Sequence, residues 1–153
     1  YDISKLYEEM GNEFPFTDDQ KTALTKLSTL FNIMRIDMTR PVTIFEGPLD
    51  AMFMPNSIAL ATAGRSTTEL DEIPTTRYMF DNDETGKKKM IEKLRRGKSV
   101  FMWSKFLSDF KLNTYTIKDL NDLVLKCFEL KKGEPLKKIE DYFTTSKLDA
   151  LYI

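Results

Sequence analysis

The sequence contains no histidine and only one cysteine, Cys127, among its 153 residues. Zinc sites of the Cys/His type need several such ligands, and the Ser-His-Asp and Cys-His catalytic arrangements both need a histidine. These classes of site are therefore excluded for this chain. Cys127 lies on the apolar face of a predicted helix, where we expect an inert core residue. Carboxylates remain as the candidate chemical groups.

Long apolar runs and an excess of one charge are also absent. No stretch approaches the ~20 apolar residues of a membrane-spanning helix, and the N-terminus lacks the basic-then-apolar pattern of a signal peptide. We therefore expect a soluble, cytoplasmic protein with no membrane partner. The 23 basic and 24 acidic residues nearly balance, so any contact with nucleic acid must come from local basic patches. The hydrophobic fraction of 41% is sufficient for one globular domain.

Residues 17–20 have the pattern of a helix start. Thr17 suits the N-cap position and Gln20 follows three residues later, as in a capping box. Apolar residues then recur at helical spacing: Ala23, Leu24, Leu27, Leu30 and Phe31. Because the chain starts at Tyr1 rather than Met and opens within a helical pattern, we expect a piece of a longer protein in which residues 1–40 are a helical lead-in.

Strand and helix patterns alternate along the middle of the chain. Short β-rich apolar segments bounded by turn residues predict strands at 42–45, 58–61, 77–80 and 99–103. Between them, helices are predicted at 49–54 and 87–95, and a helical turn within 62–76. This alternation is typical of an α/β fold with a four-stranded parallel sheet and helices on both faces. Two further helices are predicted, at 120–128 and from Pro135 to about Phe143.

Acidic residues directly follow two of the predicted strands. Glu46 comes after the first, and Asp81-Asn82-Asp83 comes after the third. The carboxyl ends of parallel strands form the ligand-binding edge of such a sheet. Carboxylates that converge there repel one another unless a hard cation lies between them, and oxygen-rich sites with few protein ligands suit Mg²⁺. The sequence therefore predicts a magnesium site, which further polar residues would widen: Asp50, Asp119, Asn121 and Asp122.

Each acidic residue also has a purely structural interpretation. An Asp-x-Asp pair before a helix is common as turn and N-cap chemistry, and Asp119 and Asn121 are good caps for the helix that begins at Leu120. Glu46 beside Gly-Pro could simply be solvated. The functional hypothesis therefore depends on the two acidic elements occurring together at strand ends.

The densest basic stretch of the chain follows the Asp-x-Asp loop. It contains Lys87, Lys88, Lys89, Lys93, Arg95, Arg96 and Lys98. Such a run is usually a solvated helix face, but this one flanks the proposed site, where its charge would hold phosphates. Lys87 and Lys88 are the candidate phosphate ligands.

Three motifs together resemble the Toprim domain that primases, topoisomerases and some nucleases share. They are Glu46-Gly47-x-x-Asp50 after a strand, Phe80-Asp81-Asn82-Asp83-x-x-Gly86, and Lys118-Asp119-x-Asn121-Asp122. The segments around them closely resemble the primases of T-even-like bacteriophages, and bacterial primases show related spacings. These segments are Ile44 to Asp50, Leu60 to Gly64 and Lys118 to Leu123. The resemblance extends from about Leu30 to the C-terminus.

This resemblance implies a Rossmann-like Toprim domain at 41–130, with a C-terminal helix and tail at 131–153 and the end of an upstream primase core at 1–40. It implies Glu46, Asp81 and Asp83 as catalytic residues. The implied metal ligands are the same three residues with Asp50 and Asp119 as supporting acids. The residues expected to contact nucleotide or nucleic acid are Lys87, Lys88, Lys118 and Asn121, and the last occupies a position that is often acidic in bacterial primases.

The implied activity is synthesis of RNA primers on a template, with Mg²⁺ as the cofactor and Mn²⁺ as a substitute. The implied partners are single-stranded DNA, ribonucleoside triphosphates and a replicative helicase, in the host cytoplasm if a phage encodes the protein. The zinc-binding module of such primases is not in this chain, which has one cysteine and no histidine. Two alternatives remain open: a Toprim nuclease or topoisomerase-like cleavage domain, and a non-catalytic Toprim binding module. The complete acidic set argues against the second.

Overall fold

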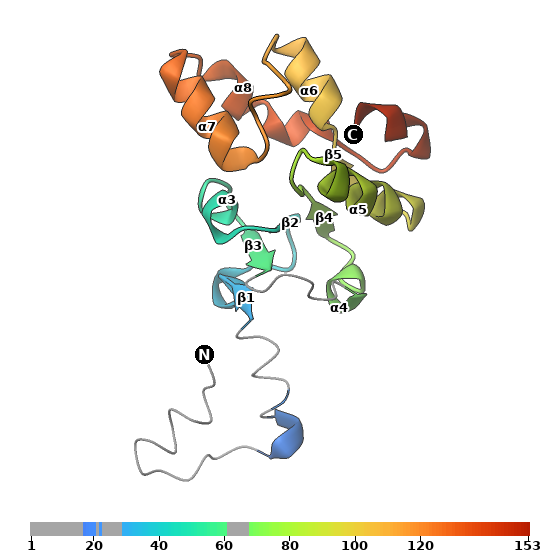
Figure 1. Cartoon of the computed structure of the whole chain (residues 1–153). Helices are drawn as coiled ribbons and strands as arrows, with labels where there is room; N and C mark the ends of the chain where they lie inside the picture. Colours follow the sequence, from blue (N-terminus) through green and yellow to red (C-terminus); the bar gives the residue numbers. More distant parts are fainter. Residues whose placement is uncertain (1–16, 21, 23–28, 61–67) are drawn as a thin grey trace.

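The computed structural model describes residues 17–20, 22, 29–60 and 68–153. Over these residues the chain has a mixed α/β fold in which helices flank a six-stranded sheet (Figure 1). The strand order is β1-β3-β2-β4-β5-β6. The predicted α/β class is confirmed. None of the helices in this part of the chain is both long enough and apolar enough to cross a bilayer.

The four predicted strands form the centre of the sheet and pair in parallel. They are β2 (Val42–Phe45), β3 (Ser57–Leu60), β4 (Thr76–Tyr78) and β5 (Ser99–Phe101). β2 pairs with β3 on one side and with β4 on the other, and β4 pairs with β5. All four residues of β2 are buried, as expected for a parallel strand whose two faces are both covered by helices.

Two short antiparallel strands were not predicted and make the sheet mixed. β1 (Leu30–Phe31) pairs with β3, and β6 (Phe143–Thr144) pairs with β5. The expectation of a four-stranded, purely parallel sheet was therefore too narrow. The helical prediction for Leu30 and Phe31 was wrong, because backbone pairing with Leu60 and Ala59 replaces helical hydrogen bonds there.

The capping box at the helix start is confirmed. The backbone N–H of Gln20 donates to Thr17 Oγ1 at 3.3 Å, and the Thr17 N–H donates to Gln20 Oε1 at 2.9 Å. Most of the predicted apolar stripe after it, residues 23–28, lies outside the described residues.

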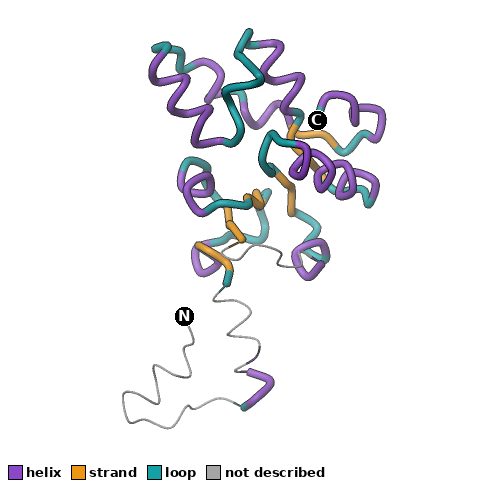
Figure 2. Tube along the Cα trace, viewed as in Figure 1, coloured by secondary structure: helices purple, strands orange, loops and turns teal. Residues whose placement is uncertain are grey.

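Helices cover both faces of the sheet, with the strands between them (Figure 2). The α-helices are α3 (Pro48–Met52), α4 (Thr68–Asp71), α5 (Glu84–Arg95), α6 (Trp103–Asp109), α7 (Leu120–Glu129) and α8 (Glu134–Lys137). The 3-10 helices are η1 (Ile33–Arg35), η2 (Ile139–Tyr142) and η3 (Lys147–Tyr152). The C-terminal helices α6, α7 and α8 lie together at one end of the sheet (Figure 1).

Several predicted boundaries were wrong for identifiable reasons. α5 begins three residues before the predicted Lys87 because Asp83 caps it. The fourth strand ends at Phe101, and Trp103 begins the unpredicted helix α6. The helix predicted from Pro135 to Phe143 is divided into α8, η2 and β6, because the chain there turns back to pair with β5.

The core lies between the sheet and the helices and is rich in aromatic rings. Trp103 is fully buried, and its indole Nε1 donates to the Phe80 carbonyl at 2.8 Å. Its ring packs edge-on against Phe101 at 4.9 Å between centroids. Cys127 is buried, as predicted, and burial raises the pKa of its thiol. The C-terminus is fixed to α6, since Ser104 Oγ donates to the carbonyl of the buried Ile153 at 2.9 Å.

Candidate functional site

The sheet has a crossover point at which β2 lies between β3 and β4. The chain leaves β2 to form β3 on one side and then returns to form β4 on the other side. In open α/β sheets, ligands bind in the crevice beyond the carboxyl ends of the strands at such a point. Glu46 follows β2 directly and Asp81 comes three residues after β4. The predicted placement of these two carboxylates at one edge is confirmed.

Asp81 is the most electrostatically perturbed carboxyl of this edge. Burial, with the neighbouring negative charges acting in the same direction, raises its pKa to about 7. The charges responsible, in decreasing order of effect, are those of Glu46, Asp50, Asp119 and Asp83. The fold therefore brings all five predicted carboxylates into one electrostatic neighbourhood, which we call the acidic cluster.

Glu46 is paired through only one of its two carboxylate oxygens. Lys89 Nζ of α5 donates to Glu46 Oε2 at 3.0 Å. The other oxygen, Oε1, is buried and has no hydrogen-bond partner among the described residues. A buried oxygen without a partner is costly. The acidic cluster thus contains an unsatisfied acceptor on Glu46 and an Asp81 carboxyl surrounded by negative charge. A bound cation would give the acceptor a partner and would offset the repulsion.

Asp50 joins α3 to the start of α7. The residue is only 6% exposed, and its Oδ1 accepts a hydrogen bond from the backbone N–H of Asn121 at 2.9 Å. Burial raises the pKa of its carboxyl. Gly47 makes room for this conformation, because a Cβ there would lie 2.9 Å from Asp50 Oδ2. Asp50 therefore supports the helix N-terminus in addition to contributing negative charge.

Asp83 and Asp119 are both helix N-caps, so their structural interpretation is confirmed. Oδ1 of Asp83 accepts from the Gly86 N–H at 2.7 Å at the start of α5. In the same way, Oδ1 of Asp119 accepts from the Asp122 N–H at 2.7 Å at the start of α7. Each cap bond uses one carboxylate oxygen, so capping leaves the other as an acceptor for a cation.

Asn82, in the middle of the Asp-x-Asp loop, fixes the loop before α7. It is 9% exposed, its Nδ2 donates to the Ile117 carbonyl at 2.8 Å, and its N–H donates to the Lys118 carbonyl at 2.5 Å. These bonds hold the chain before Asp119 against the end of β4. Sequence reasoning did not assign Asn82 a role, although an amide between two acids suits this kind of loop bonding.

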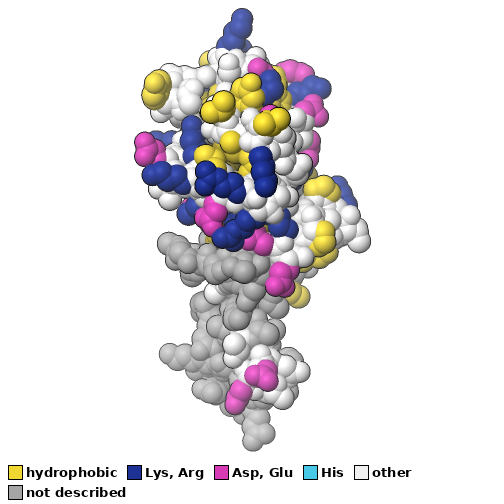
Figure 3. Space-filling view, turned by 90° about the vertical axis from the view of Figure 1, so that its right-hand side faces the viewer, with side chains coloured by type: hydrophobic (Ala, Val, Ile, Leu, Met, Phe, Trp, Pro, Cys, Tyr) yellow, Lys and Arg dark blue, Asp and Glu magenta, His cyan; other side chains and the backbone are white. Residues whose placement is uncertain are grey.

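The lysine that contacts the acidic cluster is Lys89, which belongs to the predicted basic stretch but was not among the residues expected to contact nucleotide. In the described part of the chain, no ion pair joins Lys87, Lys88 or Lys118 to the cluster. The ammonium of Lys88 is 3.9 Å from Glu84, and both side chains are largely exposed. Lys89, the third of the run, makes the contact, and its Nζ also lies 5.8 Å from the centre of the Phe80 ring. Basic side chains gather on the side of the molecule on which α5 lies (Figure 3).

The cluster is not arranged as a closed metal site. Within the described ranges, no group of three or more acidic or cysteine side chains is positioned to hold one metal ion. Two of the carboxylates cap helices, one binds a helix N-terminus and one binds Lys89. The donors nevertheless fit a hard cation in chemical type, because they are all oxygens and one is unsatisfied. In addition, burial and the neighbouring negative charges destabilise the ionised form of Asp81.

Comparison with known proteins does not assign the chain to a family. No family model matches the sequence, and no curated protein is significantly similar to it. The function is therefore inferred from the site and from the sequence motifs.

Proposed function

We propose that this chain is the Toprim catalytic region of a DNA primase. The observation that carries the proposal is the gathering of negative charge around Asp81, whose pKa is raised to about 7 by burial and by four neighbouring carboxylates. This gathering occurs beside the crossover point of the sheet. The parallel order β3-β2-β4-β5 also agrees with a Rossmann-like Toprim fold.

The proposed reaction is nucleotidyl transfer. The 3′-hydroxyl of the growing primer attacks the α-phosphorus of a ribonucleoside triphosphate, and pyrophosphate leaves. Glu46 and Asp81 would hold Mg²⁺, or Mn²⁺ in its place, with Asp83, Asp50 and Asp119 as further acids. A divalent ion in this position supplies neutralisation of phosphate charge and a lower pKa for the attacking hydroxyl.

The residues of the chain have separate tasks in this proposal. Glu46 would act on the side of the attacking hydroxyl, and its buried Oε1 has no hydrogen-bond partner among the described residues. Lys89 neutralises Glu46 in the absence of other cations. Polar residues near the cluster, two of them exposed and two half-buried, would contact the triphosphate and the nucleic acid: Lys88 and Lys118, and Lys87 and Asn121.

The choice of a primase over other Toprim activities rests on sequence. An acidic cluster at this edge would also serve a nuclease or a topoisomerase-like cleavage domain. The segments from Ile44 to Asp50 and from Lys118 to Leu123 resemble phage primases, and this resemblance favours primer synthesis. Single-stranded DNA as template, ribonucleoside triphosphates as substrates and a replicative helicase as partner belong to the same proposal.

The test is a primer-synthesis assay on the full-length protein with single-stranded DNA, labelled ribonucleotides and Mg²⁺. Asp81→Asn and Glu46→Gln keep the side-chain size and remove the charge, so each should lower synthesis by about a hundredfold or more. Glu129→Gln, on the exposed face of α7, is the matched control. Wild-type rates in both cluster variants would contradict the proposal. Cutting of labelled DNA without ribonucleotide extension would assign the site to a nuclease.

A further inference from the structure

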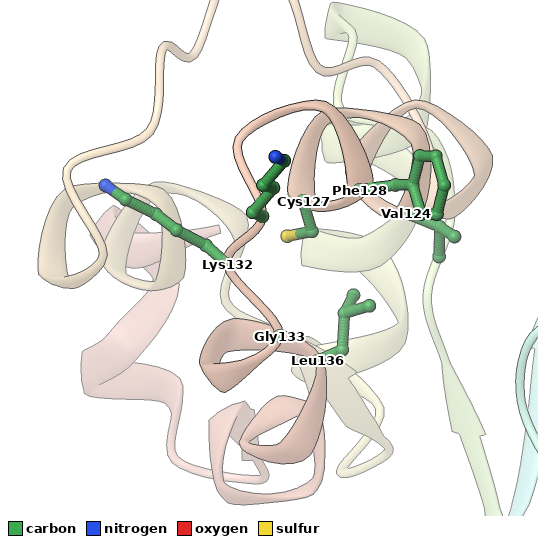
Figure 4. A pocket seen from close by; sticks show the side chains of 7 residues that line it. Val124, Cys127, Phe128, Lys132, Gly133 and Leu136 are labelled. Carbon is green, nitrogen blue, oxygen red and sulfur yellow. The ribbon is translucent and has the colours of Figure 1, made fainter.

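A hollow with a volume of about 420 Å³ lies between α7 and α8 (Figure 4). We call it the α7–α8 groove. Leu136 points from α8 toward α7, where Val124 and Cys127 lie (Figure 4). Phe128, Lys131 and Lys132 also line it. Its size is within the range of pockets that bind small ligands or anchoring side chains.

Large apolar side chains extend the groove onto the surface. Phe128 is 84% exposed, and Leu125, three residues earlier on the same helix face, is 58% exposed. Contiguous exposed apolar surface of this kind marks sites of interaction. The apolar lining and the exposed ring together form an apolar surface from Val124 to Phe128 on α7.

The charged residues that line the groove are both positive. Lys131 and Lys132 are exposed, and neither makes an ion pair in the part of the chain that the structure describes. None of the described residues that line the groove is acidic. The positive charge of Lys132 is close enough to act on the Cys127 thiol inside it, where it opposes the rise in pKa that burial causes. A ligand that fills the groove therefore meets an apolar floor and two free cations.

We propose that the α7–α8 groove binds an acidic amphipathic helix of a partner protein. Apolar side chains of that helix would enter the hollow beside Val124 and Leu136 and pack on Phe128, and its carboxylates would pair with Lys131 and Lys132. Helices that lay an apolar face into a groove are a common mode of recognition. This inference does not depend on the activity proposed above.

Nucleic acid fits the groove less well, although an exposed ring and two lysines resemble a base-stacking platform. Apart from the two lysines, the described residues of the walls offer thiol and hydrocarbon groups but no amide, hydroxyl or carboxyl side chain. A base that entered the hollow would therefore lose the hydrogen bonds of its polar edges with water, and among the lining side chains only the two lysine ammonium groups could replace any of them, which is costly. Leucine or phenylalanine side chains carry no such edges.

The groove is at the opposite end of α7 from the acidic cluster. Asp119 caps the first turn of this helix, whereas Phe128 lies in its last turn. A helix of 10 residues is about 15 Å long. A partner bound at the groove would thus contact the end of α7 that is farther from the site at which we place the chemistry.

The test is fluorescence anisotropy with a labelled synthetic peptide of roughly 14 residues, about four helical turns. The peptide has leucines at i, i+3, i+4 and i+7 and glutamates on its other face. Phe128→Ser and the double variant Lys131→Glu/Lys132→Glu should each weaken binding about tenfold or more. The matched controls are Leu148→Ser and Lys111→Glu/Lys147→Glu, which change exposed residues elsewhere and should stay within about twofold of the wild type.

Cys127 gives a second readout, because it is the only cysteine of the chain. Bound peptide should slow its reaction with a thiol reagent, and a peptide with lysines in place of the glutamates should not. Equal binding of the lysine peptide, equal weakening in the control variants, or no binding to the wild type would each overturn the proposal. So would preferential binding of oligothymidylate or of anionic phosphatidylglycerol vesicles through the same residues.

Discussion

Lys89 Nζ lies 3.0 Å from Glu46 Oε2 and links the middle of α5 to the end of β2. The lysine side chain is 45% exposed and the glutamate side chain 26%. Because the lysine is nearly half in water, it can leave the carboxylate without becoming buried elsewhere. The ammonium of Lys89 therefore neutralises the charge of Glu46, the residue that we propose as the catalytic carboxylate.

Lys89→Ala should make Mn²⁺ bind about three- to tenfold more tightly, because the variant removes a cation that competes for Glu46. It should also weaken binding of a nucleoside triphosphate, since one positive charge beside the site is lost. Electron paramagnetic resonance of free Mn²⁺ measures the first effect, and calorimetry with the triphosphate measures the second.

Arg95→Ala is the matched control for this variant, because it removes an exposed positive charge from the last turn of the same helix. It should leave the Mn²⁺ affinity unchanged. Weaker or unaltered Mn²⁺ binding in Lys89→Ala would rule out competition. Absence of Mn²⁺ binding in every variant would instead count against the proposed metal site.

Asp81→Asn should stabilise the metal-free protein at pH 8 but not at pH 4. The pKa of Asp81 is raised from 3.8 to about 7, so between these values the folded protein holds a proton that the unfolded chain has lost. Stability therefore falls as the pH rises through this window. Since the carboxyl is partly exposed, we expect a gain of only about 1–2 kcal/mol at pH 8.

Urea unfolding in the presence of a chelator, at several pH values, checks this difference. The gain of the variant over the wild type should grow from pH 4 to pH 7 and then stay constant. A gain that does not change with pH would show that Asp81 is not the group whose pKa is raised.

Gly86→Ala should destabilise the protein by about 2–4 kcal/mol. A Cβ at this position would lie 2.1 Å from the carbonyl oxygen of Asp81, which is backbone and cannot move aside. In an ordinary helix interior the same change stabilises by up to about 1 kcal/mol, so the sign of the effect is diagnostic. Gly133→Ala is the control, because nothing lies within 4 Å of a Cβ there. Equal thermal stability of the two variants would contradict the close approach.

Glu140→Ala should cost about 2–3 kcal/mol of stability, because it removes the charge partner of the buried Arg77. Arg77 Nη2 donates to Glu140 Oε1 at 2.7 Å, and the guanidinium lies 4.1 Å from the centre of the Phe143 ring. Glu129→Ala, which breaks the more exposed pair with Lys126, should cost about 0.5 kcal/mol or less. Denaturant midpoints compare the two, and similar losses would mean that burial of Arg77 adds nothing to the pair.

The parallel strands could be predicted because each is a short, contiguous apolar segment bounded by turn residues. β2 was predicted at its observed bounds, Val42–Phe45. The edge strands could not be predicted in this way. Leu30 and Phe31 continue a helical spacing, and only pairing with β3, distant in sequence, makes them a strand. Phe143 likewise follows a helical pattern, and it becomes part of a strand because its backbone pairs with β5.

The acidic cluster was predictable from strand ends, because a parallel sheet brings such positions together. The contacts that the carboxylates make there could not be predicted. The contact between Glu46 and Lys89 joins residues 43 positions apart, and which lysine of the run reaches it depends on where α5 begins. The Asp83 cap makes α5 begin at Glu84, three residues before the predicted start at Lys87. Asn82 was overlooked because its partners, Ile117 and Lys118, come from a segment with no predicted structure.

The short strands β1 and β6 cover the outer margins of the parallel sheet. A long open edge presents unpaired N–H and C=O groups onto which another chain can add a strand, and this is how many sheets polymerise. Over the described residues, each margin of the sheet ends in a strand of only two residues. Such a margin offers too few unpaired backbone groups for a strand of another chain to pair with it. The same two segments that departed from the predicted pattern thus protect the protein against edge-to-edge aggregation.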